Sequence, residues 1–359
     1  MKKFSIPLLC IMLVCMVCLS GCFSSSSNPT AGTGWITGYV FIRENSIYRS
    51  LSADSFMLTS SPRAIVNPSG FKLVTGSDAN GFTVTATKKS GNERKSVRLD
   101  QNGSFTILGL SPGKYKITIS HSNFSPVEIN KTYIVYAGQE TRTGDDILLL
   151  AHKYLFVSTN SSNEFNNLRN MLHTQNAFSS RDVYTLENSM ATKKNIINQI
   201  QRITRSAKDE DTFVFIFSGR GNKSGSNTSI VTSDGENILL SELETYVSTN
   251  NNCRDSIIIL DLDFSWNKSL LSESALEWIS PKTIVQGKNI TFFVSSSNNA
   301  DSKEQLIKII TNLMRISSGE VLTLGDIESE LPADLVRVIS NPASYNYQTV
   351  PFFRKITSN

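Results

Sequence analysis

Cysteine is scarce in this chain of 359 residues, which contains five cysteines and three histidines. Four of the cysteines, Cys10, Cys15, Cys18 and Cys22, lie within the first 22 residues, so the remainder holds Cys253 alone. A single thiol cannot form an intramolecular disulfide. Positive and negative charges are nearly balanced, because 35 Lys and Arg residues against 31 Asp and Glu residues give a formal net charge of only +4. This balance suggests no nucleic-acid partner, which would need a concentrated basic face.

The first 22 residues have the layout of a secretory signal, with Lys2 and Lys3 before an apolar stretch that ends in "LSGC". The apolar run is short for a transmembrane helix, which needs ~20 residues. The end of the segment resembles a bacterial lipobox, and this resemblance implies cleavage after residue 21 and lipidation of Cys22. We therefore expect residues 1–21 to be a lipoprotein signal peptide, and 22–34 to be a Ser/Gly-rich tether.

A lipid on Cys22 would make the membrane one partner and place the protein in the cell envelope. Phe23, the next residue, is not the aspartate associated with inner-membrane retention, which favours the outer membrane or the cell surface.

Residues 35–150 contain short alternating segments that are typical of strands. These segments are WITGYVFI, FTVTATKK, RKSVRLD, SFTILGL, YKITISH and TYIVYAG. Turn signals separate them, and we expect positive φ angles at Gly103 and Gly113. Many short strands with Gly and Pro between them predict an all-β sandwich.

The linked pair "NGSFTILGL" and "SPGKYKITIS" resembles the carboxypeptidase regulatory-like or transthyretin-like β-sandwich. Domains of that family are usually non-catalytic, which implies a role in spacing or binding. Residues 43–70 depart from the compact pattern, and we expect them to form a long loop insertion.

The second half of the chain alternates strands with helices, which predicts a mostly parallel sheet with helices on both faces. In such sheets, sites form beyond the carboxyl ends of the strands, where "SGRG" and "DLDFSW" would lie. The glycine-rich segment is not a phosphate-binding P-loop, because Lys223 follows Asn222 instead of a glycine.

The segments "DTFVFIFSGRG" and "DSIIILDLDFSW" resemble the two signatures of caspase-like proteases (peptidase C14 and metacaspase-like), over residues 153–355. The family has Ser-Gly-His-Gly and Asp-Ala-Cys at these points, where this chain has Arg220 and Asp263. Arginine keeps its proton at physiological pH and cannot act as the base. His152, in the interdomain connection, and His173, after the first helix, do not match the family's histidine. The resemblance therefore implies a caspase-like domain without its catalytic residues, and we expect no cofactor.

Two hypotheses concern the remaining site residues. Arg220 and Asp263 would form an ion pair where the catalytic dyad stood, or else be two independent solvated side chains. Asp261 matches an acidic residue that helps to bind a basic substrate residue in the metacaspase-like branch, so a remnant pocket for basic side chains would make this domain a peptide-binding module. Trp266 replaces a family glycine and would crowd the site if it points inward.

Our leading interpretation is an envelope lipoprotein whose inactive caspase-like domain binds or scaffolds an envelope protein or peptide. The alternatives are a divergent peptidase or other hydrolase that uses Asp263, and a structural surface protein without a defined ligand. A metal site at Asp234, Asp261 and Asp263 is disfavoured because no further acidic ligand is nearby in the sequence. Cys253 precedes its strand, at the wrong edge of the sheet for a nucleophile.

Overall fold

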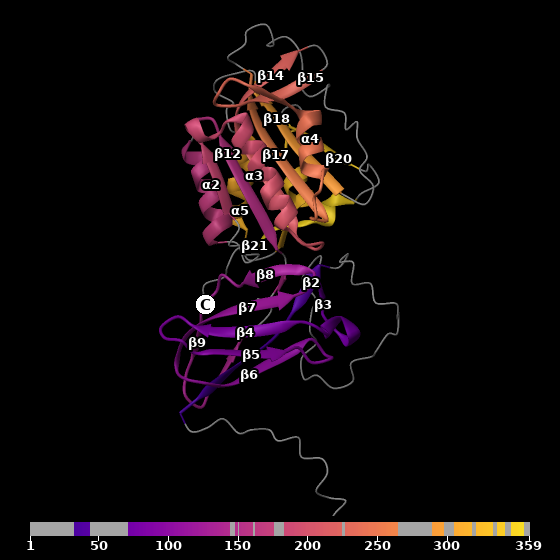
Figure 1. Cartoon of the computed structure of the whole chain (residues 1–359). Helices are drawn as coiled ribbons and strands as arrows, with labels where there is room; N and C mark the ends of the chain where they lie inside the picture. The colour runs from indigo at the N-terminus through magenta and orange to yellow at the C-terminus, as the bar shows by residue number, and fades with distance from the viewer. Residues whose placement is uncertain are drawn as a thin grey trace, which may run out of the picture.

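The computed structural model contains a β-rich N-terminal region and an α/β C-terminal region, one above the other in Figure 1. The residues that it describes are 32–43, 71–143, 148–149, 151–160, 162–175, 183–224, 227–264, 289–297, 305–317, 321–332, 336–341 and 346–354. The expected signal peptide, nearly all of the tether, most of the expected loop insertion and Trp266 lie outside these residues. Within the described residues, no helix is both long and apolar enough to cross a membrane.

The N-terminal region confirms the all-β prediction. Its strands are β1 (Gly34–Tyr39), β2 (Phe41–Arg43), β3 (Phe71–Leu73), β4 (Thr83–Lys88), β5 (Arg94–Arg98), β6 (Ser104–Leu110), β7 (Gly113–His121), β8 (Phe124–Glu128), β9 (Tyr133–Val135), β10 (Glu140–Arg142) and β11 (Leu148–Leu149). They form sheets in the orders β10-β1-β6, β11-β2-β3 and β5-β4-β7-β8, with β9 also paired to β7. Alternate residues of these strands, such as Tyr115, Ile117 and Ile119 of β7, point into one buried core.

The two predicted turn glycines have positive φ angles, +75° at Gly103 and +152° at Gly113. At Gly103 a second reason excludes larger residues, because a Cβ atom would lie 2.0 Å from the carbonyl oxygen of Val74. Strands β3, β8, β10 and β11 were not predicted; they are between two and five residues long.

The C-terminal region confirms the predicted α/β sheet. Its strands are β12 (His152–Ser158), β13 (Val183–Glu187), β14 (Thr212–Ser224), β15 (Asn227–Val231), β16 (Asn237–Leu239), β17 (Asp255–Asp263), β18 (Asn289–Ser297), β19 (Val321–Thr323), β20 (Val336–Asn341) and β21 (Pro351–Arg354). Its helices are α2 (Asn163–Thr174), α3 (Lys193–Ser206), α4 (Leu240–Ser248), α5 (Gln305–Ile316) and α6 (Leu324–Ser329). The main sheet has the order β13-β12-β14-β17-β18-β20, in which all pairs are parallel except the antiparallel pair β18 and β20.

Helices cover both faces of this sheet because its central strands are apolar on both sides. Phe213, Phe215 and Phe217 of β14 pack with apolar residues of α3 and α4. The intervening Val214 and Ile216 pack on the opposite face, with residues of α2, α5 and α6. This continuous burial explains why β14 and β17 have nearly unbroken apolar sequences instead of alternating ones.

Strand β14 continues past the sheet and pairs there with β15, which pairs with β16. These three antiparallel segments stand beyond the carboxyl ends of the parallel strands (Figure 1).

The two regions meet at the opposite edge of the sheet, before β14 begins. The turn between β7 and β8 accepts hydrogen bonds at the Ser122 oxygen from Lys208 Nζ (2.8 Å) and at the Asn123 oxygen from the Glu210 amide (3.2 Å). The carboxylate of Asp211, which has no exposed surface, accepts bonds from the amide and hydroxyl of Ser125, at 3.0 and 2.6 Å. The β-rich region therefore contacts the amino edge of the sheet and leaves the carboxyl edge to the candidate site.

Candidate functional site

A cavity of about 850 Å³ lies at the carboxyl edge of the α/β sheet. It is bounded by the ends of β12, β14 and β17, by the start of α2, and by the turn between β15 and β16. Its lining residues are Thr159, Asn160, Ser162, Asn188, Ser189, Ser218, Gly219, Arg220, Val231, Thr232, Ser233, Gly235, Asp261 and Asp263. The residues predicted from the two signature segments thus come together at one cavity.

Arg220 and Asp263 are direct register partners in the parallel strands β14 and β17. Partners in adjacent strands project their side chains to the same face of a sheet. Arg220 is exposed, Asp263 is partly buried, and both line the cavity. A cation and an anion therefore stand side by side at the two positions that the sequence analysis matched to the base and the nucleophile of caspase-like proteases.

The glycines on either side of Arg220 are required by close packing. A Cβ atom on Gly219 would lie 2.3 Å from the hydroxyl oxygen of Thr159, and one on Gly221 would lie 2.5 to 3.0 Å from ring atoms of Phe264. Phe264 follows β17 directly and is 1% exposed. The "GRG" sequence therefore allows the ends of three strands to approach one another closely around the cavity.

Asp261 borders the cavity, but its carboxylate supports helix α5. Its two oxygens accept hydrogen bonds from the Ser295 hydroxyl (2.6 Å) and from the Ile307 amide (2.9 Å), which is in the first turn of the helix. The residue is 4% exposed. Because helix N-terminal amides lack partners within the helix, this carboxylate acts as a cap provided by a neighbouring strand. The predicted pocket for a basic side chain would have to share a carboxylate that already has these structural partners.

Hydroxyl and amide side chains form much of the wall and were not identified from the sequence as site residues. They include Thr159, Asn160 and Ser162 after β12, and Thr232 and Ser233 in the β15–β16 turn. The polar run "TNSSN" directly after the buried strand β12 was the available signal for the first group. Ser162 also caps α2 by accepting a bond from the Phe165 amide at 3.1 Å.

Asp234 belongs to the β15–β16 turn and does not line the cavity. Its carboxylate accepts hydrogen bonds from the Thr232 hydroxyl and from the Lys193 amide (3.3 Å), and the Thr232 bond is the main reason that its pKa is lowered. Across the part of the chain that the structure describes, no group of three or more His, Cys, Asp and Glu residues is arranged to hold a metal ion.

The thiol and the imidazoles lie away from the cavity. Cys253 is fully buried and precedes the first residue of β17, whereas Asp263 is the last, so the nine-residue strand separates them by roughly 30 Å. His152 is the first residue of β12 and not part of a connection; it is buried, with Nδ1 2.8 Å from the Tyr154 hydroxyl. His173 is exposed near the end of α2. Among the described residues that line the cavity, none is Cys or His.

Comparison with known families agrees with this architecture. The model of the carboxypeptidase regulatory-like domain matches residues 73–147, and the model of the metacaspase, peptidase C14 domain matches residues 148–300. Two successive parts of the chain thus match a carboxypeptidase regulatory-like domain and a metacaspase-type, caspase-like domain, in the order that the sequence motifs predicted. No curated protein matches the chain.

Two solved structures are also similar to the chain. Protein GSU0716 from Geobacter sulfurreducens has a TM-score of 0.39 and 10% identity, over 56% of this chain and 99% of its own. The Drosophila initiator caspase Dronc has a TM-score of 0.33 and 8% identity, over 56% of this chain and 80% of its own.

Proposed function

We propose that the caspase-like domain is catalytically inactive and binds an envelope protein or peptide at its carboxyl-edge cavity. The observation that carries this proposal is the register pair of Arg220 and Asp263, at the positions where the family has histidine and cysteine. Cysteine peptidase chemistry needs a thiolate beside a base that takes a proton and later returns it. Arginine is always protonated, and the described residues that line the cavity include no Cys and no His.

The cavity itself supports a binding role. It is lined mainly by hydroxyl and amide groups, which can donate and accept hydrogen bonds to a peptide backbone. Its volume of about 850 Å³ is within the usual range of ligand pockets.

The proposal is tested with fluorogenic peptides that carry basic or acidic residues before the scissile bond. We expect no turnover by the native protein. The double variant Arg220→His/Asp263→Cys restores the family's dyad, and single variants at each position serve as controls. Turnover by the double variant alone would show that the scaffold is intact and that the two substitutions disable it.

A native hydrolase that uses Asp263 is the alternative. In that case the native protein would turn over substrate, and Asp263→Asn would abolish turnover while leaving the fold intact. That result would overturn the proposed inactivity. The binding role is tested separately by capture from an envelope extract. Reproducible capture of one envelope protein by the native protein, and loss of that capture on substitution of cavity residues such as Asn160 and Ser233, would support binding at the cavity.

The proposed location rests on the N-terminal segment, in which Cys22 would carry the lipid. Metabolic labelling with palmitate followed by membrane fractionation tests it directly. We expect label in the native protein and none in Cys22→Ser. Labelled Cys22→Ser protein, or native protein without label, would remove the lipid anchor from the proposal without affecting the peptidase assay.

A further inference from the structure

The outer face of the sheet β5-β4-β7-β8 is polar, and the strand register defines its residues. Val84 and Ala86 of β4 and Ile117 of β7 point into the core, so the intervening residues point outward. Three rows of register partners follow across the strands. They are Arg98, Thr83 and Ser120; Ser96, Thr85, Thr118 and Glu128; and Arg94, Thr87 and Lys116. Thr85 in the middle row is 2% exposed, and its hydroxyl lies 2.8 Å from that of Ser96. Lys114 and Ile134 form a fourth row where β9 pairs with β7.

This face gathers positive charge from two separate strands. Arg94 and Arg98 of β5 and Lys114 of β7 are exposed, and Lys116 is partly exposed. Glu128 is the acidic residue among these described outward positions. The Lys116 ammonium is held in place by the carbonyl oxygens of Ile129 (3.4 Å) and Asn130 (3.0 Å).

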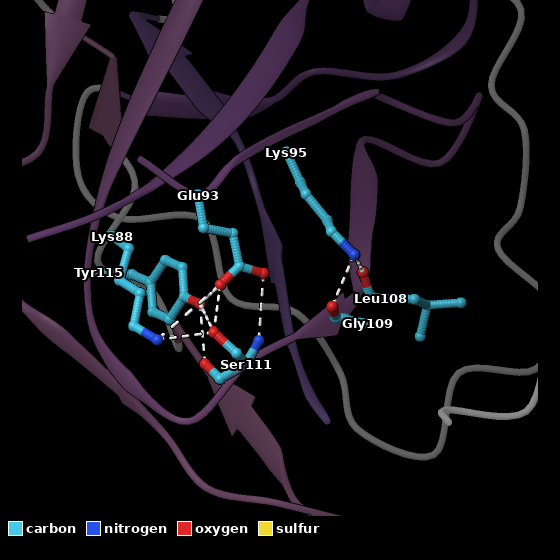
Figure 2. Close-up of polar contacts among 7 residues, drawn as sticks. All are labelled: Lys88, Glu93, Lys95, Leu108, Gly109, Ser111 and Tyr115. Atoms are coloured by element: carbon cyan, nitrogen blue, oxygen red, sulfur yellow. Dashed lines mark hydrogen bonds and ion pairs between the residues drawn. The ribbon is translucent and has the colours of Figure 1, made fainter. Parts of the chain in front are cut away.

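Two of the three lysines of the β4–β5 hairpin, Lys88 and Lys95, belong to the opposite side of the strands. Figure 2 shows Lys88 directed at Ser111, with Nζ 2.6 Å from its hydroxyl, and Lys95 directed at the Gly109 oxygen, also at 2.6 Å. The segment "KKSGNERKSVR" (residues 88–98) therefore divides its cations, and Arg94 and Arg98 are those that the outer face receives.

The spacing of these cations suits an extended anionic chain. Arg94 and Arg98 are four residues apart along one strand, or about 13 Å, and Arg94 and Lys116 are two strands apart, or about 10 Å. Between them stand the hydroxyl groups of Thr83, Thr87 and Thr118, which can donate or accept hydrogen bonds.

The composition of the face disfavours other anionic partners. Membrane-surface binding draws on buried apolar area, and Ile134 is the one large apolar side chain among the outward register positions. Protein interfaces have apolar or aromatic centres, and sheets that bind single-stranded nucleic acid stack bases on aromatic rings. Aromatic side chains do not occupy these described outward positions.

We infer that the outer face of this sheet binds an acidic polysaccharide, whose carboxylate or sulfate groups contact Arg94, Arg98, Lys114 and Lys116 while its hydroxyls contact Thr83, Thr87 and Thr118. This surface belongs to the β-rich region, and the inference does not depend on the function of the caspase-like cavity.

The test uses the full chain, purified in detergent, and measures its affinity for heparin and polygalacturonate, with neutral dextran as a blank. The variant Arg94→Glu/Arg98→Glu reverses two charges on the face. The matched control Lys194→Glu/Arg205→Glu reverses two exposed charges on α3, in the other region, and changes the net charge equally. We expect the face variant to bind both acidic polymers at least about tenfold more weakly, and the control to stay within about twofold of the native protein.

Equal losses of affinity in the two variants would show that binding depends on net charge alone, and this would overturn the inference. Unchanged affinity in the face variant would overturn it as well. Vesicles of phosphatidylglycerol and a single-stranded oligonucleotide provide the competing ligands. Arginine-dependent binding to either of these without binding to the polysaccharides would also overturn it. Circular dichroism shows whether each variant keeps the native fold.

Discussion

Arg220 and Asp263 are neighbours across two central parallel strands of the caspase-like sheet, and both line its carboxyl-edge cavity. A permanent positive charge thus lies beside a negative one at the two positions that we predict to correspond to the family's base and nucleophile. We expect their side chains to be energetically coupled, with the guanidinium directed at the carboxylate.

A double-mutant cycle of Arg220→Gln and Asp263→Asn measures this coupling from chemical unfolding. Because Arg220 is exposed, the coupling free energy should be small, about 0.5 to 1 kcal/mol. The exchanged pair Arg220→Asp/Asp263→Arg should recover part of it. Additive single effects would mean that the two charges are independently solvated, as the alternative hypothesis holds.

Asp261 should matter more for stability than for recognition. Asp261→Ala leaves the Ser295 hydroxyl and the Ile307 amide without their buried acceptor, and we expect a loss of about 3 kcal/mol in the free energy of unfolding. Asp263→Ala, two residues further along the same strand, is the matched control and should lose less than about 1 kcal/mol. A stable Asp261→Ala protein that had lost binding of a basic peptide would instead support the remnant pocket.

The sequence predicted most of the fold because the strong signals were local. β17 matches the predicted strand at residues 255–263, since an apolar run flanked by polar residues determines it within a few residues. The role of Asp261 could not be predicted in this way, because its partners Ser295 and Ile307 are 34 and 46 residues away.

The clustering of charge on one face likewise could not be predicted from local sequence. Arg94 and Lys116 face the same side only through the register of β4 with β5 and β7, so the near-neutral composition concealed the basic face of the sheet. The contact of Ser125 in β8 with Asp211 likewise joins residues 86 positions apart.

The contact at Asp211 should hold the two regions together. Besides the bonds from Ser125, its carboxylate accepts a bond from the Lys208 amide (2.9 Å) and lies 3.7 Å from Lys153 Nζ. In Asp211→Ala, we expect the amides of Ser125 and Glu210 to exchange with solvent faster in hydrogen-exchange measurements, because both donate across the contact.

The exposed neighbour Asp209 provides the control for this prediction, since Asp209→Ala removes an acid without removing a contact across the boundary. Amides inside β14, such as that of Phe215, should keep their protection in both variants. Unchanged exchange at Ser125 in Asp211→Ala would show that the regions are held by other contacts.

The carboxylate of Glu93 links the β4–β5 and β6–β7 turns of the β-rich region (Figure 2). It accepts hydrogen bonds from the Tyr115 hydroxyl (2.6 Å) and from the amide (3.1 Å) and hydroxyl of Ser111. Burial, followed by the bond to Glu93, raises the pKa of Tyr115 to about 12 from its usual 10.0. Burial alone would raise the pKa of Glu93, but the bonds from Ser111 and Tyr115 outweigh it and lower that pKa.

The raised pKa of Tyr115 and the lowered pKa of Glu93 predict two pH ranges in which the protein loses stability. A raised pKa at Tyr115 contributes stability that is fully present below pH 10 and is lost as the pH rises from 10 through 12. The lowered pKa of Glu93 contributes stability that is present above its usual value of 4.5 and is lost as the pH falls through the folded-state value.

Tyr115→Phe should therefore unfold more easily at neutral pH, yet lose less further stability between pH 10 and 12 than the native protein. Tyr136→Phe, at a tyrosine that is 55% exposed, is the control and should follow the native profile. Parallel profiles for the native protein and Tyr115→Phe in that window would contradict the shift.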